Sequence, residues 1–381
     1  MQRLRRYDKS YYKQRKDSIM AEDSIENLIR PHLVRVDTYD AMDAPETLVE
    51  KSGISLENII KLNGNENPYG GSPLAVKAVA EVPLHIYPDP RQIKMRKSLS
   101  EYTGMREENI VVGAGADELI DLIFRLFISP GDTILDCEPT FGMYSFCAGL
   151  AGADVHYVQR DTEFQIDPVT VKSAITDTTK LMFVTSPNNP TGNVAREEDI
   201  LALLETGLIV VVDEAYFEFA KSSAQDLVED HENLIILRTM SKWAGLAGLR
   251  VGYGIMSPKV ASYMMEIKPP YNVNVAAEAA LLASLQDANY LLGNVEKIIN
   301  ERERMMQLIS GVSGITPWPS DGNYLLCEFG ENEALRVFKE LASKGIFVRN
   351  FKSDRLKNFF RIAVGKPEET DLLVDALKQI M

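Results

Sequence analysis

Residues 234–250 read LIILRTMSKWAGLAGLR, in which four apolar residues lead into a polar turn that contains Lys242. The apolar run is typical of a buried strand, so the lysine follows the end of that strand. Hydroxyl-bearing and small residues flank Lys242, and its amine could form a Schiff base with an aldehyde cofactor. Most lysines are solvated surface charges, so the rest of the chain has to decide between these interpretations.

The sequence on both sides of this stretch alternates apolar strands with helices. Further apolar runs occur at residues 110–112, 133–137, 181–184, 208–212 and 251–255. Near-continuous apolar strands separated by helices indicate an α/β fold with a largely parallel sheet covered on both faces. The polar motifs follow the carboxyl ends of these strands, where open α/β sheets bind ligands.

The length of 381 residues exceeds one ordinary core, so we expect two domains. We assign residues 68–270 to a large domain. From residue 271 the pattern changes, with one long helical region at 276–309, broken near Gly293, followed by mixed strands and helices. We expect residues 21–67 and 271–381 to form together a smaller α+β domain.

The charge of the chain is uneven. The formal net charge of −14 argues against non-specific nucleic-acid binding, which requires a basic surface. Residues 1–16 nevertheless hold seven basic side chains against one acidic side chain. We expect residues 1–20 to be a disordered basic arm, with Met20 as an alternative start. A targeting or interaction role for the arm is the other interpretation.

The apolar runs and the cysteines indicate where the protein is located and whether it binds a metal. No apolar run approaches the roughly 20 residues that span a bilayer, so we expect no membrane partner. Cys137, Cys147 and Cys327 lack metal-ligand spacing and are typical of small buried residues in a reducing compartment. We therefore expect a cytoplasmic protein without a metal site.

Several motifs together resemble one enzyme family. SPNNPTG at 186–192 and DEAY at 213–216 follow successive strands, and NENPYG lies upstream at 65–70. With Ser241-Lys242 and an arginine eight residues later, the set resembles the fold-type I, class I/II pyridoxal-phosphate aminotransferases. The resemblance covers residues 57–380 and is strongest to their histidinol-phosphate aminotransferase branch. It implies a mostly parallel seven-stranded sheet in the large domain, a smaller α+β domain, and pyridoxal 5′-phosphate as cofactor.

The resemblance implies catalytic roles for Lys242, Asp213 and Tyr216. Lys242 would carry the cofactor as a Schiff base and, once displaced by the substrate amine, move a proton at the substrate α-carbon. Asp213 would pair with the pyridine nitrogen and keep the ring protonated as an electron sink. Tyr216 and Asn189 would donate to the phenolic oxygen. Taken alone, Asp213 could be a surface aspartate, Tyr216 a helix-facing aromatic and Asn189 a turn residue.

The phosphate group of the cofactor requires an anion site. Gly115, Ala116 and Asp117 lie at a strand-to-helix junction, where backbone amides bind anions readily. Further donors are expected from Thr239, Ser241 and Arg250.

Two aromatic residues complete the expected cofactor site. Tyr69 matches a tyrosine that reaches the phosphate from a second subunit, which implies a homodimer with shared active sites. Phe141 occupies the position of an aromatic that stacks on the pyridine ring, although a plain core aromatic is the other interpretation.

Two arginines are the main candidates for substrate binding. Arg361 lies inside an apolar strand, and a buried arginine is costly unless an anion pairs with it. The resemblance places Arg349 nearby, and two arginines suit a phosphate dianion better than a carboxylate. Tyr69 and Asn189 complete the expected substrate set. Residues 38–45 lack the Pro-Gly turn that is usual at the corresponding position of the histidinol-phosphate branch.

The expected activity is transfer of an amino group from histidinol phosphate to 2-oxoglutarate, as part of histidine biosynthesis. Two alternatives share the cofactor motifs: a threonine-phosphate decarboxylase, and an aminotransferase for aromatic or other amino acids. A third, a non-catalytic regulator on the same scaffold, is disfavoured because the net charge is wrong for DNA and Lys242 is present.

Overall fold

The computed structural model describes residues 25–36, 38–39 and 41–381, so the expected basic arm lies outside the described residues. The largest sheet has seven strands in the order β2-β8-β7-β6-β5-β3-β4. Their bounds are β2 Ile110–Gly113, β3 Thr133–Glu138, β4 Asp154–Gln159, β5 Thr179–Thr185, β6 Ile209–Asp213, β7 Leu234–Thr239 and β8 Gly252–Met256. Only β8 runs antiparallel to its neighbours among the described strands of this sheet, which confirms the expected seven-stranded, mostly parallel arrangement.

The two faces of this sheet are buried in different cores, because alternate residues of a strand point in opposite directions. Val211 and Ile235 join a core formed with three helices, whereas Val210 and Ile236 join a core on the other face. The helices of the first core are α5 (Ala116–Phe127), α6 (Met143–Ala151) and α10 (Pro258–Ile267), and the second includes α8 (Glu197–Leu204). Coverage on both faces explains why these strands are apolar throughout.

Two local predictions were wrong. Strand β4 was not expected, because it lies at the edge of the sheet and mostly exposes its residues, so it contains no apolar run. The long helical region breaks at Asp287, between α11 (Val275–Gln286) and α12 (Ala288–Ser310), rather than near Gly293. Asp287 has a non-helical backbone and its carboxylate accepts a hydrogen bond from Ser72, whereas Gly293 lies within α12.

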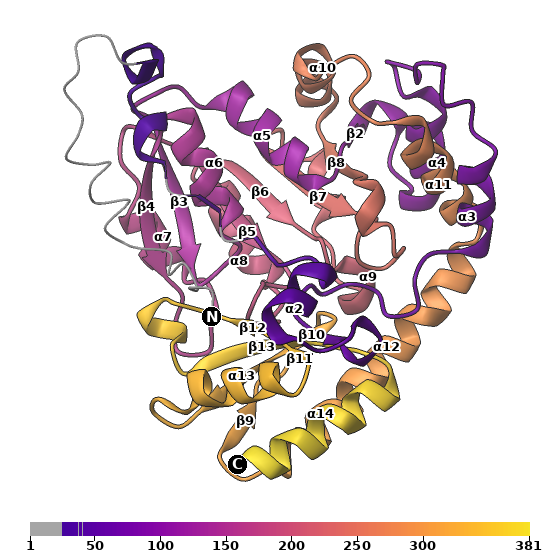
Figure 1. Ribbon diagram of the computed structural model, residues 1–381. Helices are drawn as coiled ribbons and strands as arrows, with labels where there is room; N and C mark the ends of the chain where they lie inside the picture. Colours follow the sequence, from indigo (N-terminus) through magenta and orange to yellow (C-terminus); the bar gives the residue numbers. More distant parts are fainter. Residues whose placement is uncertain (1–24, 37, 40) are drawn as a thin grey trace.

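A second, four-stranded sheet lies towards the C-terminus, in the order β12-β13-β10-β9. Its strands are β9 Ile315–Pro317, β10 Tyr324–Phe329, β12 Arg349–Asn350 and β13 Phe359–Ala363. Helix α13 (Glu333–Ser343) packs on this sheet, and α14 (Pro367–Ile380) packs against α12 and α13. A short pair joins the chain's early and late parts, because β1 (Ile60–Lys61) runs parallel to β11 (Ile346–Phe347). The long helix α12 runs from α11 to the second sheet, where it contacts β9 and β10 (Figure 1).

The remaining helices are α2 Pro45–Ser52, α3 Pro73–Ala80, α4 Ile93–Thr103, α7 Pro168–Ser173 and α9 Phe217–Ala220. Helix α11 packs against α3 and α4. The division into residues 68–270 and residues 21–67 with 271–381 stays a prediction. Within the described part of the chain, no helix is both long and apolar enough to cross a bilayer.

Candidate active site

A cleft of about 1290 Å³ opens at the carboxyl ends of the central strands. Its lining includes the predicted site residues Ala116, Asp117, Phe141, Asn189, Asp213, Tyr216, Thr239, Ser241, Lys242, Arg250, Arg349 and Arg361. These residues come from both sheets and the connections between their strands, so the fold brings together positions up to 245 residues apart in the sequence (116 to 361). Gly115 and Tyr69 are the predicted site residues that do not line the cleft.

Lys242 lies in the turn after β7. Its Nζ donates a hydrogen bond to the carbonyl oxygen of Gly64 at 3.2 Å. Burial lowers the pKa of Lys242 to about 8, and the positive charge of Arg361 acts in the same direction. A substantial fraction of the amine is therefore neutral near physiological pH, which is the form that attacks an aldehyde or accepts a proton.

Asp213 ends β6 and is buried in the floor of the cleft. Its Oδ2 accepts a hydrogen bond from the hydroxyl of Tyr144 at 2.7 Å, and its Oδ1 accepts one from the amide of Ala215 at 3.1 Å. Burial raises the pKa of Asp213 to about 6, against the two hydrogen bonds, which lower it. A cation placed against this carboxylate would relieve the cost of burying its charge, so the site fits a protonated pyridine nitrogen.

Tyr144 was not predicted as a site residue. It lies in the first turn of α6, and its hydroxyl also contacts Thr185 Oγ1 at 2.8 Å while its ring stacks on Phe183. The available signal was its spacing of three residues from Phe141, whose ring meets Tyr144 edge-on at 5.7 Å.

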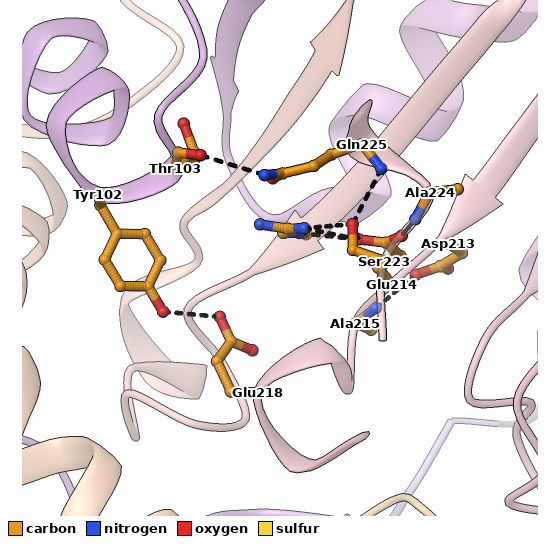
Figure 2. A network of polar contacts seen from close by, with 10 residues as sticks. Tyr102, Thr103, Asp213, Glu214, Ala215, Glu218, Ser223, Ala224 and Gln225 are labelled. Carbon is orange, nitrogen blue, oxygen red and sulfur yellow. Dashed lines mark hydrogen bonds and ion pairs between the residues drawn. The ribbon is translucent and has the colours of Figure 1, made fainter. Parts of the chain in front are cut away.

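A buried polar network lies directly behind Asp213. Figure 2 shows Glu214 with Ser223 and Ala224, which donate to its carboxylate at 2.8 and 2.7 Å, and Tyr102, which donates to Glu218. Glu214 also pairs with the guanidinium of Arg238 at 2.8 Å, and both side chains are almost fully buried. This pair ties the end of β6 to the end of β7, the two strands that deliver Asp213 and Lys242.

Both predicted donors to the phenolic oxygen have a proton to give. The hydroxyl oxygen of Tyr216 accepts a hydrogen bond from Asn65 Nδ2 at 2.9 Å, which leaves its own O–H to donate. The carbonyl oxygen of Asn189 accepts from Arg361 Nη1 at 2.5 Å, which leaves its amide nitrogen to donate. Asn65 is a functional candidate that strand-end reasoning missed, because it lies far upstream in a turn.

The expected phosphate donors converge on one corner of the cleft. Arg250 Nη2 pairs with Asp117 Oδ2 at 2.7 Å, and Nη1 lies 3.4 Å from the hydroxyl of Ser241. Thr239 donates to that same hydroxyl at 2.9 Å. Gly115 has a φ of +84°, and a Cβ there would lie 2.6 Å from Arg250 Nη2. Gly115 therefore contributes by leaving room for the guanidinium, and the corner fits a phosphate group.

Arg361 and Arg349 stand directly opposite each other in the antiparallel pair of β13 and β12. Arg361 is 5% exposed, and its Nη2 donates to the carbonyl oxygen of Asn63 at 2.6 Å. Its Nε has no hydrogen-bond partner within the described residues, and none of the ion pairs there involves it. A buried cation with a spare N–H favours an anionic ligand.

Residues 32, 36, 38, 39 and 41–45 line one side of the cleft, although this segment lacks the Pro-Gly turn. Tyr39 contributes an aromatic ring that meets Phe141 edge-on at 6.3 Å. Tyr69 faces elsewhere, with Lys297 Nζ 5.1 Å from the centre of its ring. The described residues contain no group of three or more His, Cys, Asp or Glu side chains suited to a metal ion.

Comparison with known proteins agrees with this geometry. The family model for aminotransferases of class I and II matches residues 57–377, so the chain belongs to this family of fold-type I, pyridoxal-phosphate-dependent enzymes. A histidinol-phosphate aminotransferase from Dehalococcoides mccartyi is 46% identical over 358 residues, covering 94% of this chain and 99% of that protein.

Solved structures extend the comparison. The histidinol-phosphate aminotransferase from Sinorhizobium meliloti, in complex with pyridoxal-5′-phosphate, has a TM-score of 0.85 and 26% identity, with 92% of this chain and 97% of that one covered. The L-threonine-O-3-phosphate decarboxylase from Porphyromonas gingivalis has a TM-score of 0.73 but only 19% identity, with coverage of 84% and 99%, so it shares the fold alone.

Proposed function

We propose that this enzyme transfers the amino group of histidinol phosphate to 2-oxoglutarate, with pyridoxal 5′-phosphate as cofactor. The observation that carries the proposal is the arginine pair at the cleft. Buried Arg361, whose Nε has no hydrogen-bond partner among the described residues, stands opposite Arg349. Two cations suit a phosphate dianion. The near full-length similarity to histidinol-phosphate aminotransferases supports the same substrate.

The cofactor would be held at three points. Its phosphate fits the corner formed by the start of α5, Ser241 and Arg250. Its ring nitrogen fits the buried carboxylate of Asp213, and its phenolic oxygen fits the donors Tyr216 and Asn189. The bound cofactor supplies an electron sink that makes the substrate α-hydrogen acidic.

The residues of this chain would then move protons and position the substrate. Lys242 would hold the cofactor at rest and, once the substrate amine has displaced it, its neutral amine would accept the proton of the substrate α-carbon. Asp213 stays ionised against the cationic ring nitrogen, which stabilises both charges in a buried site. Arg361 and Arg349 hold the substrate phosphate and so fix the α-carbon next to Lys242.

We also propose that two copies form the working enzyme, each lending Tyr69 to the other's cleft. Tyr69 does not line its own cleft, and exposed apolar side chains follow it in the sequence at residues 74–87 and recur at Tyr271, which stacks on Tyr87. These side chains are Leu74, Val76, Leu84, Ile86, Tyr87 and Tyr271. Exposed apolar residues in such number are typical of a protein interface. The cytoplasmic location stays a prediction.

An amino-donor screen tests the substrate. Purified enzyme with pyridoxal phosphate, histidinol phosphate and 2-oxoglutarate is expected to form glutamate, measured by a coupled dehydrogenase assay. Arg361→Lys should raise KM for histidinol phosphate, because lysine keeps the charge but loses the guanidinium geometry. Glutamate formation only with aromatic donors would assign a different aminotransferase. Carbon dioxide release from threonine phosphate without a keto acid would assign the decarboxylase.

A further inference from the structure

The anion-binding turn at residues 113–117 is tied by side chains to a distant loop. One carboxylate oxygen of Glu118, Oε2, accepts a hydrogen bond from the amide of Ala114 at 2.6 Å. The same oxygen accepts a second hydrogen bond from Asn272 Nδ2 at 2.7 Å. Residue 272 follows Glu118 by 154 positions, so this contact connects the turn to a separate part of the chain.

Both polar atoms of the Asn272 side chain form hydrogen bonds in this connection. Its Nδ2 also donates to the carbonyl oxygen of Val112 at 3.0 Å, while its Oδ1 accepts from Gln92 at 3.0 Å and from Lys268 at 3.4 Å. Gln92 is buried and bonds both backbone groups of Val112, at 2.7 and 2.9 Å. The last residues of β2 are therefore held by two side chains from outside the sheet.

These contacts determine which amides remain for an anion. The amide of Ala114 bonds Glu118, and the amide of Gly115 bonds the carbonyl oxygen of Gly113 at 2.8 Å. The amides of Ala116 and Asp117 open helix α5 and have no carbonyl one turn earlier within the helix. The Ala116 and Asp117 amides thus remain for an anion, and Glu118 and Asn272 hold Val112 and Ala114 just before them.

We propose that Glu118 and Asn272 are positioning residues that set the affinity of this turn for the cofactor phosphate, and that they couple this affinity to the association of two copies. The inference rests on the proposed function for the identity of the anion and for the dimer. Glu118 and Asn272 together form a clamp on the turn, and the coupling follows from the neighbours of this clamp. Tyr271 precedes Asn272, is exposed, and stacks on exposed Tyr87 at 4.6 Å.

A second copy covering Tyr87 and Tyr271 would restrain both segments that hold the turn, since Tyr87 lies five residues before Gln92 and Tyr271 immediately precedes Asn272. Such restraint would lower the entropic cost of holding the turn, so the phosphate would bind more tightly to the dimer. Linkage requires the converse, that the bound phosphate strengthens association by the same factor.

Binding to the apoenzyme tests the clamp, with pyridoxal phosphate compared to pyridoxal, which lacks the phosphate. Asn272→Ala is expected to raise the Kd of pyridoxal phosphate roughly ten-fold, the effect of about one lost hydrogen bond, and to leave the Kd of pyridoxal unchanged. Asn233→Ala is the matched control, because Asn233 Nδ2 also bonds two carbonyl oxygens, those of Leu204 and Leu208, away from the cleft. It should change neither Kd.

Glu118 offers a conservative rescue. The amide of Ala114 and Asn272 share one oxygen of Glu118, and glutamine has one carbonyl oxygen that can accept both bonds. Glu118→Gln should therefore bind pyridoxal phosphate at least as tightly as the wild type, whereas Glu118→Ala should behave like Asn272→Ala. Equal weakening of both ligands would reduce the clamp to a structural role and overturn the inference.

Sedimentation velocity tests the coupling. Pyridoxal phosphate is expected to lower the dimer dissociation constant of the wild type and to have a smaller effect on Asn272→Ala. A wild-type dimer that does not respond to the cofactor overturns the coupling. Failure of the wild type to bind pyridoxal phosphate at all would instead contradict the proposed function, so the two failures are distinguishable.

Discussion

The chemistry of the site depends on how Lys242 is buried. An unperturbed lysine titrates near pH 10.4, whereas burial and the charge of Arg361 lower the pKa of Lys242 to about 8. Below pH 8 the neutral fraction of the amine rises about ten-fold per pH unit, and above pH 8 it levels off. We expect the rate constant for cofactor loading onto the apoenzyme to follow this curve, measured by stopped-flow absorbance and trapped with borohydride.

Lys242→Ala provides the control for the loading experiment and should show neither a borohydride-stable product nor turnover. A loading rate that keeps rising to pH 10, as for a free lysine amine, would contradict the assigned environment of Lys242.

Asp213 leads to a prediction in which stability and activity change in opposite directions. Its pKa in the folded apoenzyme is about 6, above the unfolded value, so the folded state binds more protons between about pH 4 and pH 6. The contribution of Asp213 to the stability of the folded state is therefore fully present below about pH 4 and is lost as the pH rises through 6. Asp213→Asn removes this loss and should stabilise the apoenzyme at pH 7.5 by up to about 3 kcal/mol, measured by urea unfolding.

Turnover of Asp213→Asn should fall on the order of 10²- to 10³-fold, because an amide cannot stabilise a cationic ring nitrogen as a carboxylate does. An apoenzyme variant that is no more stable than the wild type between pH 6 and pH 8 would show that burial does not dominate the pKa of Asp213.

Single residues differ in how far the sequence could predict them. Asp213 and Lys242 were predictable because each follows the end of an apolar strand, and those ends meet at one edge of a parallel sheet. Tyr144 and Asn65 were missed because neither follows the end of an apolar strand: Tyr144 reaches the site from a helix, and Asn65 from a segment far upstream. Arg250 was predicted as a phosphate cation, and its pairing with Asp117 could not be read from spacing.

At the scale of elements, the ends of β6 and β7 are joined by the buried pair of Glu214 and Arg238. Removing one partner leaves a buried charge without compensation, which typically costs about 3–5 kcal/mol. We expect Glu214→Ala to lower the free energy of unfolding by about that amount, measured by urea denaturation at pH 7.5. Arg125→Ala is the control, because its pair with Asp121 is exposed and should contribute less than about 1 kcal/mol. Equal effects of both substitutions would mean that the buried pair is not a structural link between the strands.

The elements themselves were predicted best where burial is complete. Strands such as β6 and β7 are apolar on both faces and give a clear signal. Strand β4 is an exposed edge strand, and its pattern does not differ from that of a loop. At the break between α11 and α12, Asp287 accepts a hydrogen bond from Ser72, a contact that no local pattern around residue 287 could indicate.

At the scale of the whole molecule, the cleft forms because distant parts of the chain meet. The short pairing of β1 with β11 brings the segment before the large sheet next to the strands that carry Arg349 and Arg361. Arg361 could be suggested from its place inside an apolar strand, whereas Arg349 was suggested only through the resemblance, since their opposition across two strands depends on register. The position of residues 38, 39 and 41–45 beside the cleft is likewise a tertiary feature.

The shared site predicts that two inactive variants restore each other. Lys242→Ala removes a residue that acts within its own cleft, whereas Tyr69→Ala removes one proposed to act in the partner's cleft. In a hybrid dimer one cleft then has both defects and the other has none. Random pairing at equal amounts makes half of the dimers hybrids with one intact site, so co-expression should give about a quarter of the wild-type activity.

The pairing of Lys242→Ala with Asp213→Asn is the matched control for this restoration. Both residues line the same cleft of one chain, so each site of the hybrid keeps one defect and no activity should return. If the mixture of Lys242→Ala with Tyr69→Ala were no more active than its parents, Tyr69 would not cross to a second copy. Because that outcome would leave Lys242 and Asp213 in their roles, the experiment separates the architecture of the dimer from the chemistry of the cleft.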